Sequence, residues 1–182
     1  MLDGKSKFNS KNTGILLISH GSRLPIASET INKLAEMYRE ETDFKVGVGY
    51  MEIKTPNIPE AMDELVKGTK IDTVIAVPVF LAHGIHTTRD IPKILGLSLD
   101  SEDEKSLEHN HNDITDNHHN HHHHHKHHNP HNNNNHEHSH HHHHHEIDKV
   151  NFDGRIIYTE PLGADPLVLE IIKNRVDSVL NQ

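Results

Sequence analysis

The sequence has 182 residues, no cysteine, no tryptophan and 23 histidines, and its formal net charge is −9. An acidic chain without a basic cluster does not favour nucleic-acid binding, and the lack of cysteine excludes disulfides and thiolate metal sites. No apolar run approaches the roughly 18 residues of a membrane-spanning helix, and the polar start does not resemble a signal peptide. We therefore expect a soluble cytoplasmic protein with no membrane partner.

The histidines are distributed very unevenly along the chain. Residues 101–146 hold 20 of them and only two apolar side chains, Leu107 and Ile114. Such a segment cannot bury enough apolar surface to offset the entropy lost on ordering, so we predict a disordered His-rich insertion. We expect a flexible N-terminus over 1–13 and a single domain over 14–182, interrupted by this insertion.

Outside the insertion, strand and helix patterns alternate. Continuous β-branched apolar runs are typical of buried strands, and apolar residues at i, i+3 and i+4 are typical of helices. We expect strands over residues 14–19, 44–52, 71–80 and 154–163. We expect helices over residues 27–42, where Ser28 is a candidate cap, 57–68, 88–95 and 164–180. This alternation predicts an α/β fold whose four-stranded parallel sheet is flanked by helices.

Only His20, His83 and His86 lie outside the insertion. Ligands of parallel sheets bind beyond the carboxyl ends of the strands, at the point where the strand order reverses. His20 follows the first strand and His86 follows the third. In the common strand order 2-1-3-4 these strands are neighbours, so both imidazoles should emerge at one rim, a few ångströms apart.

Taken singly, the histidine motifs are weak signals. His20-Gly21 fits an ordinary turn as well as a site where Gly21 lets the backbone approach a ligand. A histidine phosphatase would carry an arginine where Ser19 stands, which argues against that class. His83 and His86 could share a metal, or His83 could be a polar lining residue, and we favour His86 because it lies further along the rim.

The motifs in combination are more specific. HGSR follows the first strand, ME precedes a proline after the second, and FLAHGIHTTRDIP follows the third. Together they resemble the small class II chelatases, above all the short archaeal cobaltochelatases and nickelochelatases, which also carry a His-rich insertion. The resemblance implies insertion of Co²⁺ or Ni²⁺ into sirohydrochlorin for a cobalamin-type or nickel-tetrapyrrole pathway, with the metal as substrate and no tightly bound cofactor.

The resemblance also implies roles for individual residues. His20 and His86 would hold the metal, and His20 would accept protons from the pyrrole nitrogens. The substrate-binding residues would be Thr55, Leu81, Ala82, His83, Gly84, Ile85 and His86. Many members of the family carry an acid at the position of Thr55, so either Glu52 takes over part of that role or the position is dispensable.

These residue types suit the implied chemistry. Imidazole binds cobalt and nickel well, and a site with two protein ligands leaves positions open for the macrocycle nitrogens. Imidazole also accepts protons near neutral pH. The substrate is a polycarboxylate, for which Arg23, Arg89 and Lys54 are candidate partners.

Three questions stay open at the level of sequence. The larger class II chelatases pair two such domains around one cleft, so we expect a homodimer. The alternative function is a His-rich metal-storage or metallochaperone protein, in which the domain is only a scaffold. The insertion itself could be a metal reservoir, a nickel buffer or a tolerated expansion.

Overall fold

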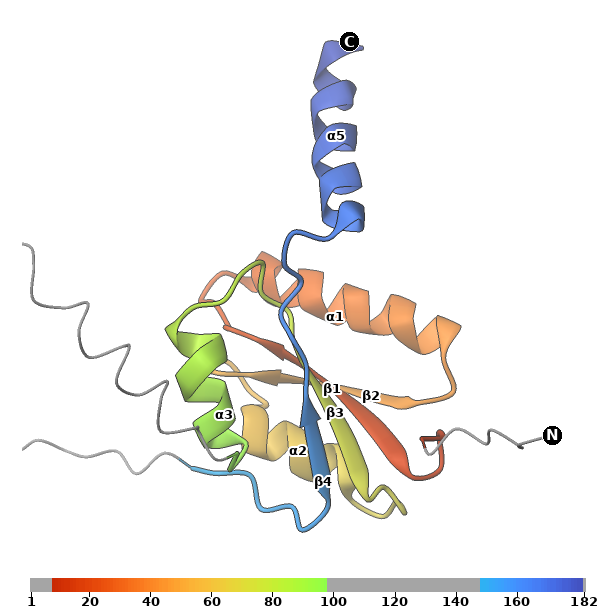
Figure 1. The fold of residues 1–182 in the computed structure, drawn as a ribbon, viewed down its shortest axis with the longest axis vertical. Helices are drawn as coiled ribbons and strands as arrows, with labels where there is room; N and C mark the ends of the chain where they lie inside the picture. The colour runs from red at the N-terminus through yellow and green to blue at the C-terminus, as the bar shows by residue number, and fades with distance from the viewer. Residues whose placement is uncertain (1–7, 98–147, 182) are drawn as a thin grey trace, which may run out of the picture. The chain divides into compact units, whose positions relative to one another are not determined.

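The computed structural model describes residues 8–97 and 148–181. The predicted His-rich insertion lies outside these residues. Four parallel strands form one sheet in the order β2-β1-β3-β4, as predicted (Figure 1). The strands are β1 (Thr13–Ser19), β2 (Lys45–Tyr50), β3 (Thr73–Pro78) and β4 (Arg155–Tyr158). The helices are α1 (Pro25–Glu41), α2 (Ile58–Val66), the π-helical turn η1 (His86–Asp90), α3 (Ile91–Ile94) and α5 (Pro166–Leu180).

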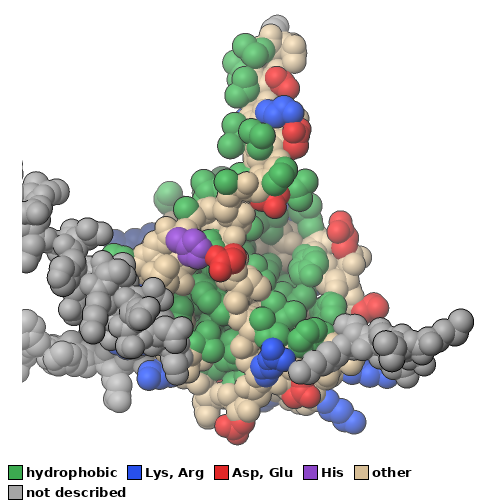
Figure 2. All heavy atoms as spheres, viewed as in Figure 1, with side chains coloured by type: hydrophobic (Ala, Val, Ile, Leu, Met, Phe, Trp, Pro, Cys, Tyr) green, Lys and Arg blue, Asp and Glu red, His purple; other side chains and the backbone are tan. Residues whose placement is uncertain are grey.

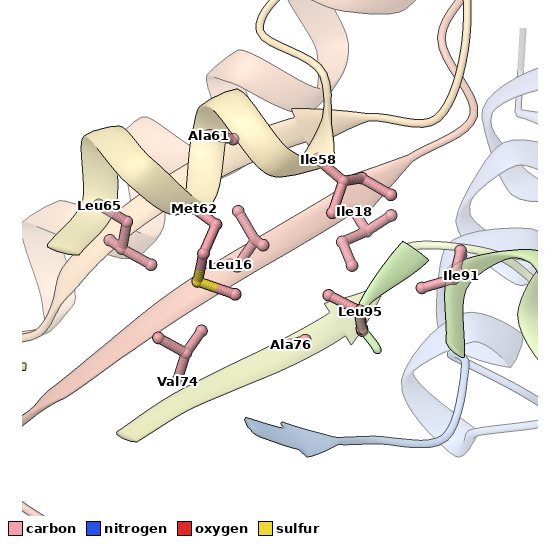
Figure 3. Close-up of a cluster of buried hydrophobic side chains, with 10 residues drawn as sticks. All are labelled: Leu16, Ile18, Ile58, Ala61, Met62, Leu65, Val74, Ala76, Ile91 and Leu95. Atoms are coloured by element: carbon pink, nitrogen blue, oxygen red, sulfur yellow. The ribbon is translucent and has the colours of Figure 1, made fainter. Parts of the chain in front are cut away.

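Helices cover both faces of the sheet, and alternate strand residues supply two separate cores. On one face, Leu16 and Ile18 pack with Met62 of α2 and Ile91 of α3 (Figure 3). On the other face, Ile15 and Leu17 belong to a cluster that includes Ile31 and Ala35 of α1. Burial of each large aliphatic side chain contributes about 1.5–3 kcal/mol, so these two layers hold the helices against the sheet. In the part of the chain that is described, no helix is both long and apolar enough to cross a membrane.

The helix starts differ from the predicted ones. The first helix begins at Pro25 rather than at residue 27, because proline is pre-organised for the first helical turn. Ser28 therefore lies inside α1 and is no cap, and its buried hydroxyl has no hydrogen-bond partner. The second helix has a capping box that sequence reasoning missed, in which Asn57 and Glu60 bond each other's backbone N–H groups.

The short helix predicted over 88–95 is a composite. It begins at His86 with the π-helical turn η1 and continues as α3. Single π-helical turns are frequent at functional sites. The start of this helix therefore lies at the histidine that the sequence singled out.

The closing helix, α5, begins at Pro166. Asp165 caps its start, because its side chain accepts a hydrogen bond from the backbone N–H of Leu167. None of its residues is buried. Its apolar side chains are exposed, and they run along one side of the helix (Figure 2). The exposed residues are Leu167, Leu169, Ile171, Ile172, Val176, Val179 and Leu180.

The edge strand β2 is tied to both flanking helices. Arg39 of α1 donates two hydrogen bonds, of 3.0 and 2.8 Å, to the carbonyl oxygen of Val46. Lys45 donates to the carbonyl oxygens of Glu64 and Leu65 at the end of α2. A cation at a helix C-terminus also complements the helix dipole.

At the N-terminus, residues 1–7 of the segment predicted to be flexible lie outside the described residues. Residues 9–12 form a turn in which the backbone N–H groups of Asn12 and Thr13 both bond the carbonyl oxygen of Asn9. Thr13 is fully buried at the start of β1. The first strand thus starts one residue before the predicted domain boundary.

Candidate functional site

His20 and His86 meet at the carboxyl end of the sheet. Their ring centroids lie 5.0 Å apart, with an angle of 67° between the ring planes. With metal–nitrogen bonds of about 2.0–2.1 Å, two imidazoles on one tetrahedral ion have centroids about 5 Å apart. The spacing of the rings is therefore compatible with one metal ion bound between them.

Both rings are held through the same nitrogen. Nδ1 of His20 lies 3.0 Å from the carbonyl oxygen of Gly21, and Nδ1 of His86 lies 2.9 Å from Oδ2 of Asp90. A carbonyl or a carboxylate can only accept, so each Nδ1 carries the proton of the neutral ring. Nε2 of each ring is then left with a free lone pair, which is the form that binds a metal or a proton.

The loop after β2 fixes the backbone around His20. The N–H of Met51 donates to the carbonyl of Ser19, and the N–H of Glu52 donates to the carbonyl of His20. Gly21 has a φ of +91°, and a Cβ there would collide with the carbonyl oxygen of Glu52. Gly21 is thus required by the approach of Glu52, whereas the sequence had suggested the approach of a ligand.

The same loop contains a strained residue. Ile53 has a φ of +69°, and the N–H of Lys54 donates to the carbonyl oxygen of Glu52 at 2.7 Å. These are features of a γ-turn with a positive φ, which is rare and strained, especially for a β-branched residue. Strain of this kind is concentrated at functional sites, and here it lies in the loop that fixes His20.

A hydrogen-bond network fixes the start of η1 at His86. Thr87 is buried, and its hydroxyl bonds both the backbone N–H and the carbonyl of Gly84. The hydroxyl of Thr88 donates to the same carbonyl. From β4, the hydroxyl of Tyr158 donates to the carbonyl oxygen of Thr87 at 2.9 Å. The turn that carries His86 is therefore anchored to the neighbouring strand.

Burial, with a smaller contribution from the nearby charge of Glu160, raises the pKa of Tyr158 to about 12. Ionisation of this phenol is therefore less favourable in the folded protein than in the unfolded chain. The stabilisation of the folded protein by the neutral phenol is present below pH 10, the usual pKa of tyrosine. It is lost as the pH rises from 10 to about 12.

Tyr158→Phe removes both this ionisation and the hydrogen bond to Thr87. We expect the free energy of unfolding at pH 7 to fall by about 1–2 kcal/mol, because a buried carbonyl loses its donor. We also expect stability to fall less between pH 10 and 12 than in the unmodified protein. Urea denaturation at pH 7 measures the loss of stability, and urea denaturation at pH 10 and at pH 12 measures how stability depends on pH. A pH dependence equal to that of the unmodified protein would contradict the assignment of the raised pKa to Tyr158.

The other predicted site residues do not form a close pair like that of His20 and His86. Nε2 of His83 lies 2.6 Å from Oε2 of Glu160, a partner that sequence reasoning missed. Leu81, Ala82 and His83 line an apolar pocket of about 560 Å³ with the segment after β4 and with α5. Gly84 and Ile85 continue the loop, and Thr55 is exposed between β2 and α2.

The candidate cations for a polycarboxylate differ in their surroundings. Arg89 is engaged by Asp90, since its Nε lies 2.9 Å from Oδ1. Arg23 is exposed in the loop that follows His20, and Lys54 lies in the strained loop. Within the described ranges 8–97 and 148–181, no group of three or more His, Cys, Asp or Glu side chains could hold a metal ion. A metal bound between His20 and His86 would therefore keep open coordination positions.

Known proteins of one family match the sequence of this chain. The family model described as CbiX matches residues 14–179. The chain belongs to the CbiX family. Among CbiX relatives, the sirohydrochlorin cobaltochelatase of Methanothermobacter thermautotrophicus is 45% identical over 167 residues, which cover 92% of each chain. The sirohydrochlorin cobaltochelatase of Methanocaldococcus jannaschii is 48% identical, over 88% of this chain and 95% of the relative.

A solved structure shares the fold of this CbiX chain. It is that of the sirohydrochlorin chelatase SirB from Bacillus subtilis subspecies spizizenii in complex with cobalt, with a TM-score of 0.55 and 18% identity. The match covers 92% of this chain but 51% of SirB. The CbiX chain therefore corresponds to about half of the SirB chain.

Proposed function

We propose that this protein is a sirohydrochlorin cobaltochelatase, which inserts Co²⁺ into the macrocycle and releases two pyrrole protons. The observation that carries the proposal is the pair of imidazoles at the sheet rim, His20 and His86, with centroids 5.0 Å apart and Nε2 free on both. Close CbiX relatives named as sirohydrochlorin cobaltochelatases support the choice of substrate and metal.

The chain supplies three things to the reaction. First, the two Nε2 atoms bind Co²⁺ while leaving its remaining positions to the four macrocycle nitrogens. Second, Nε2 of His20 can take up one of the two pyrrole protons as the metal passes from it to the macrocycle, and the other proton leaves to solvent. Third, the loop over 81–86 and the loop that carries Thr55 offer contacts to the tetrapyrrole. Cobalt enters as a substrate and leaves within the product.

An insertion assay tests the proposal directly. The purified protein is incubated with sirohydrochlorin and Co²⁺, and the absorption change of the macrocycle is compared with a reaction lacking protein. A parallel reaction with Ni²⁺ tests the second metal that the sequence suggested. A storage protein would bind cobalt without accelerating the absorption change, and that result would exclude the chelatase.

We further propose that the active form is a homodimer. The chain corresponds to about half of SirB, so a second copy would supply a missing half. The exposed apolar side of α5 is the surface for this contact, because none of its residues is buried within one chain. Exposed contiguous apolar surface of this kind marks an interaction site in proteins.

Val176→Asp should dissociate the dimer, because a buried carboxylate would lack a partner in an apolar interface. The matched control is Asn174→Asp, which adds the same charge on the polar side of the same helix. Sedimentation velocity at micromolar concentration should give a dimer for the unmodified protein and the control, and a monomer for Val176→Asp. A monomeric unmodified protein would contradict the assignment.

A further inference from the structure

Asp90 places its carboxylate beside the side chain of His86. It is the last residue of η1, and its backbone continues in helical conformation into α3. Oδ2 lies 2.9 Å from Nδ1 of His86, and Oδ1 lies 2.9 Å from Nε of Arg89. The carboxylate thus contacts the predicted metal ligand that lies four residues earlier on the same helix.

This contact constrains His86 in two ways. The carboxylate fixes the proton on Nδ1, which leaves Nε2 as the ligating atom. It also limits rotation of the ring, because Arg89 holds the second carboxylate oxygen. The side chains of Asp90 and His86 are 25% and 39% exposed, so the contact is partly shielded from water. Carboxylates placed in this way behind a ligating histidine fix its tautomer and the orientation of its ring.

The two histidines of the site are supported differently. Nδ1 of His20 has a neutral backbone carbonyl as its partner, whereas Nδ1 of His86 has an anionic carboxylate. A negative charge behind the ring favours binding of a cation at Nε2 more than a carbonyl dipole does. His86 is therefore the better permanent ligand, and His20 is freer to exchange metal for a proton.

We infer that Asp90 is a positioning residue for cobalt insertion, which acts through His86 and sets the affinity of the site for Co²⁺. The inference rests on the proposed cobaltochelatase function. Loss of a partner behind a ligating histidine typically weakens metal binding by about 10–100-fold. We expect this loss to appear as a rise in the KM for cobalt, because Asp90 bonds the metal ligand His86. Its other partner, Arg89, is a candidate cation for the substrate carboxylates and would be released, which should not raise the KM for sirohydrochlorin.

The experiment compares Asp90→Ala, Asp90→Asn and the unmodified full-length protein in steady-state insertion. Free Co²⁺ is set with a chelator buffer, because the 20 histidines of the insertion would dominate any direct measurement of bound cobalt. Asp90→Ala should raise the KM for cobalt by about 10–100-fold. Asp90→Asn keeps an acceptor oxygen for Nδ1 but lacks the charge. Its KM for cobalt should therefore lie between those of Asp90→Ala and the unmodified protein.

The matched control is Glu36→Gln, which removes a carboxylate from the exposed ion pair with Lys33 and should leave both KM values unchanged. If Asp90→Ala fails to fold, Asp90→Asn decides the question, because it preserves the shape of the side chain. A KM for cobalt within twofold of the unmodified value in both folded variants would overturn the inference, as would a rise confined to the KM for sirohydrochlorin. Failure of the unmodified protein to insert cobalt would instead overturn the proposed function.

Discussion

His20→Ala and His86→Ala should each reduce the rate of cobalt insertion by roughly 10²–10⁴-fold at saturating sirohydrochlorin. Each variant removes one of the two imidazoles of the proposed metal site, so the metal loses a ligand and, for His20, one pyrrole proton loses its acceptor. Both side chains are only partly buried at the sheet rim, so the fold should persist. Initial rates from the absorption change, with circular dichroism as a check on folding, measure the effect.

His83→Ala is the matched comparison, because it also removes an imidazole from the same loop as His86. His83 is bonded to Glu160 and makes no ring contact with His20, so we expect a decrease of less than about tenfold. Near-normal turnover of either His20→Ala or His86→Ala would refute the assigned metal site. An equal loss in all three variants would mean that the whole loop, and not the pair, controls insertion.

Gly21→Ala should lower the free energy of unfolding by about 2–4 kcal/mol and also impair insertion. Two costs add at this position. The φ of +91° is unfavourable for any residue with a Cβ, and that Cβ would collide with the carbonyl oxygen of Glu52. Relief of the collision would displace either His20 or the strained loop at Ile53, so the ring would leave its place beside His86.

Gly84→Ala is the control for this prediction. Gly84 also lies in a loop at the same rim, but a Cβ there would meet no atom within 4 Å, and its φ is not positive. We expect a change in unfolding free energy of less than about 0.5 kcal/mol. Urea denaturation compares the two variants, and equal stability of Gly21→Ala and Gly84→Ala would show that the approach of Glu52 is dispensable.

The strand order and the meeting of His20 with His86 could be predicted from sequence for a simple reason. Continuous apolar runs identify buried strands, and the rules for parallel sheets then leave few arrangements. In the order β2-β1-β3-β4, the first and third strands are neighbours, so their carboxyl ends meet. A separation of 66 residues in sequence thus became a spacing of 5.0 Å between ring centroids.

The supporting contacts of the site could not be predicted in the same way. Asp90 follows His86 by four residues, a spacing that brings two side chains together on a helix, but the predicted helix began at residue 88 and so did not include His86. Glu160 follows the fourth strand, and its bond to His83 depends on how two loops cross. The collision that requires Gly21 involves the backbone of Glu52, and a sequence carries no local pattern for such an approach.

The hydrogen bonds of Arg39 to Val46 bear on how the protein avoids aggregation. An edge strand with free carbonyl and N–H groups is a template on which another chain can add a strand. On β2, the guanidinium of Arg39 donates hydrogen bonds to one of these carbonyls and places a positive charge beside the strand. At the other edge, β4 has only four residues, which is a short template. Neither edge therefore favours growth of the sheet from one molecule into the next.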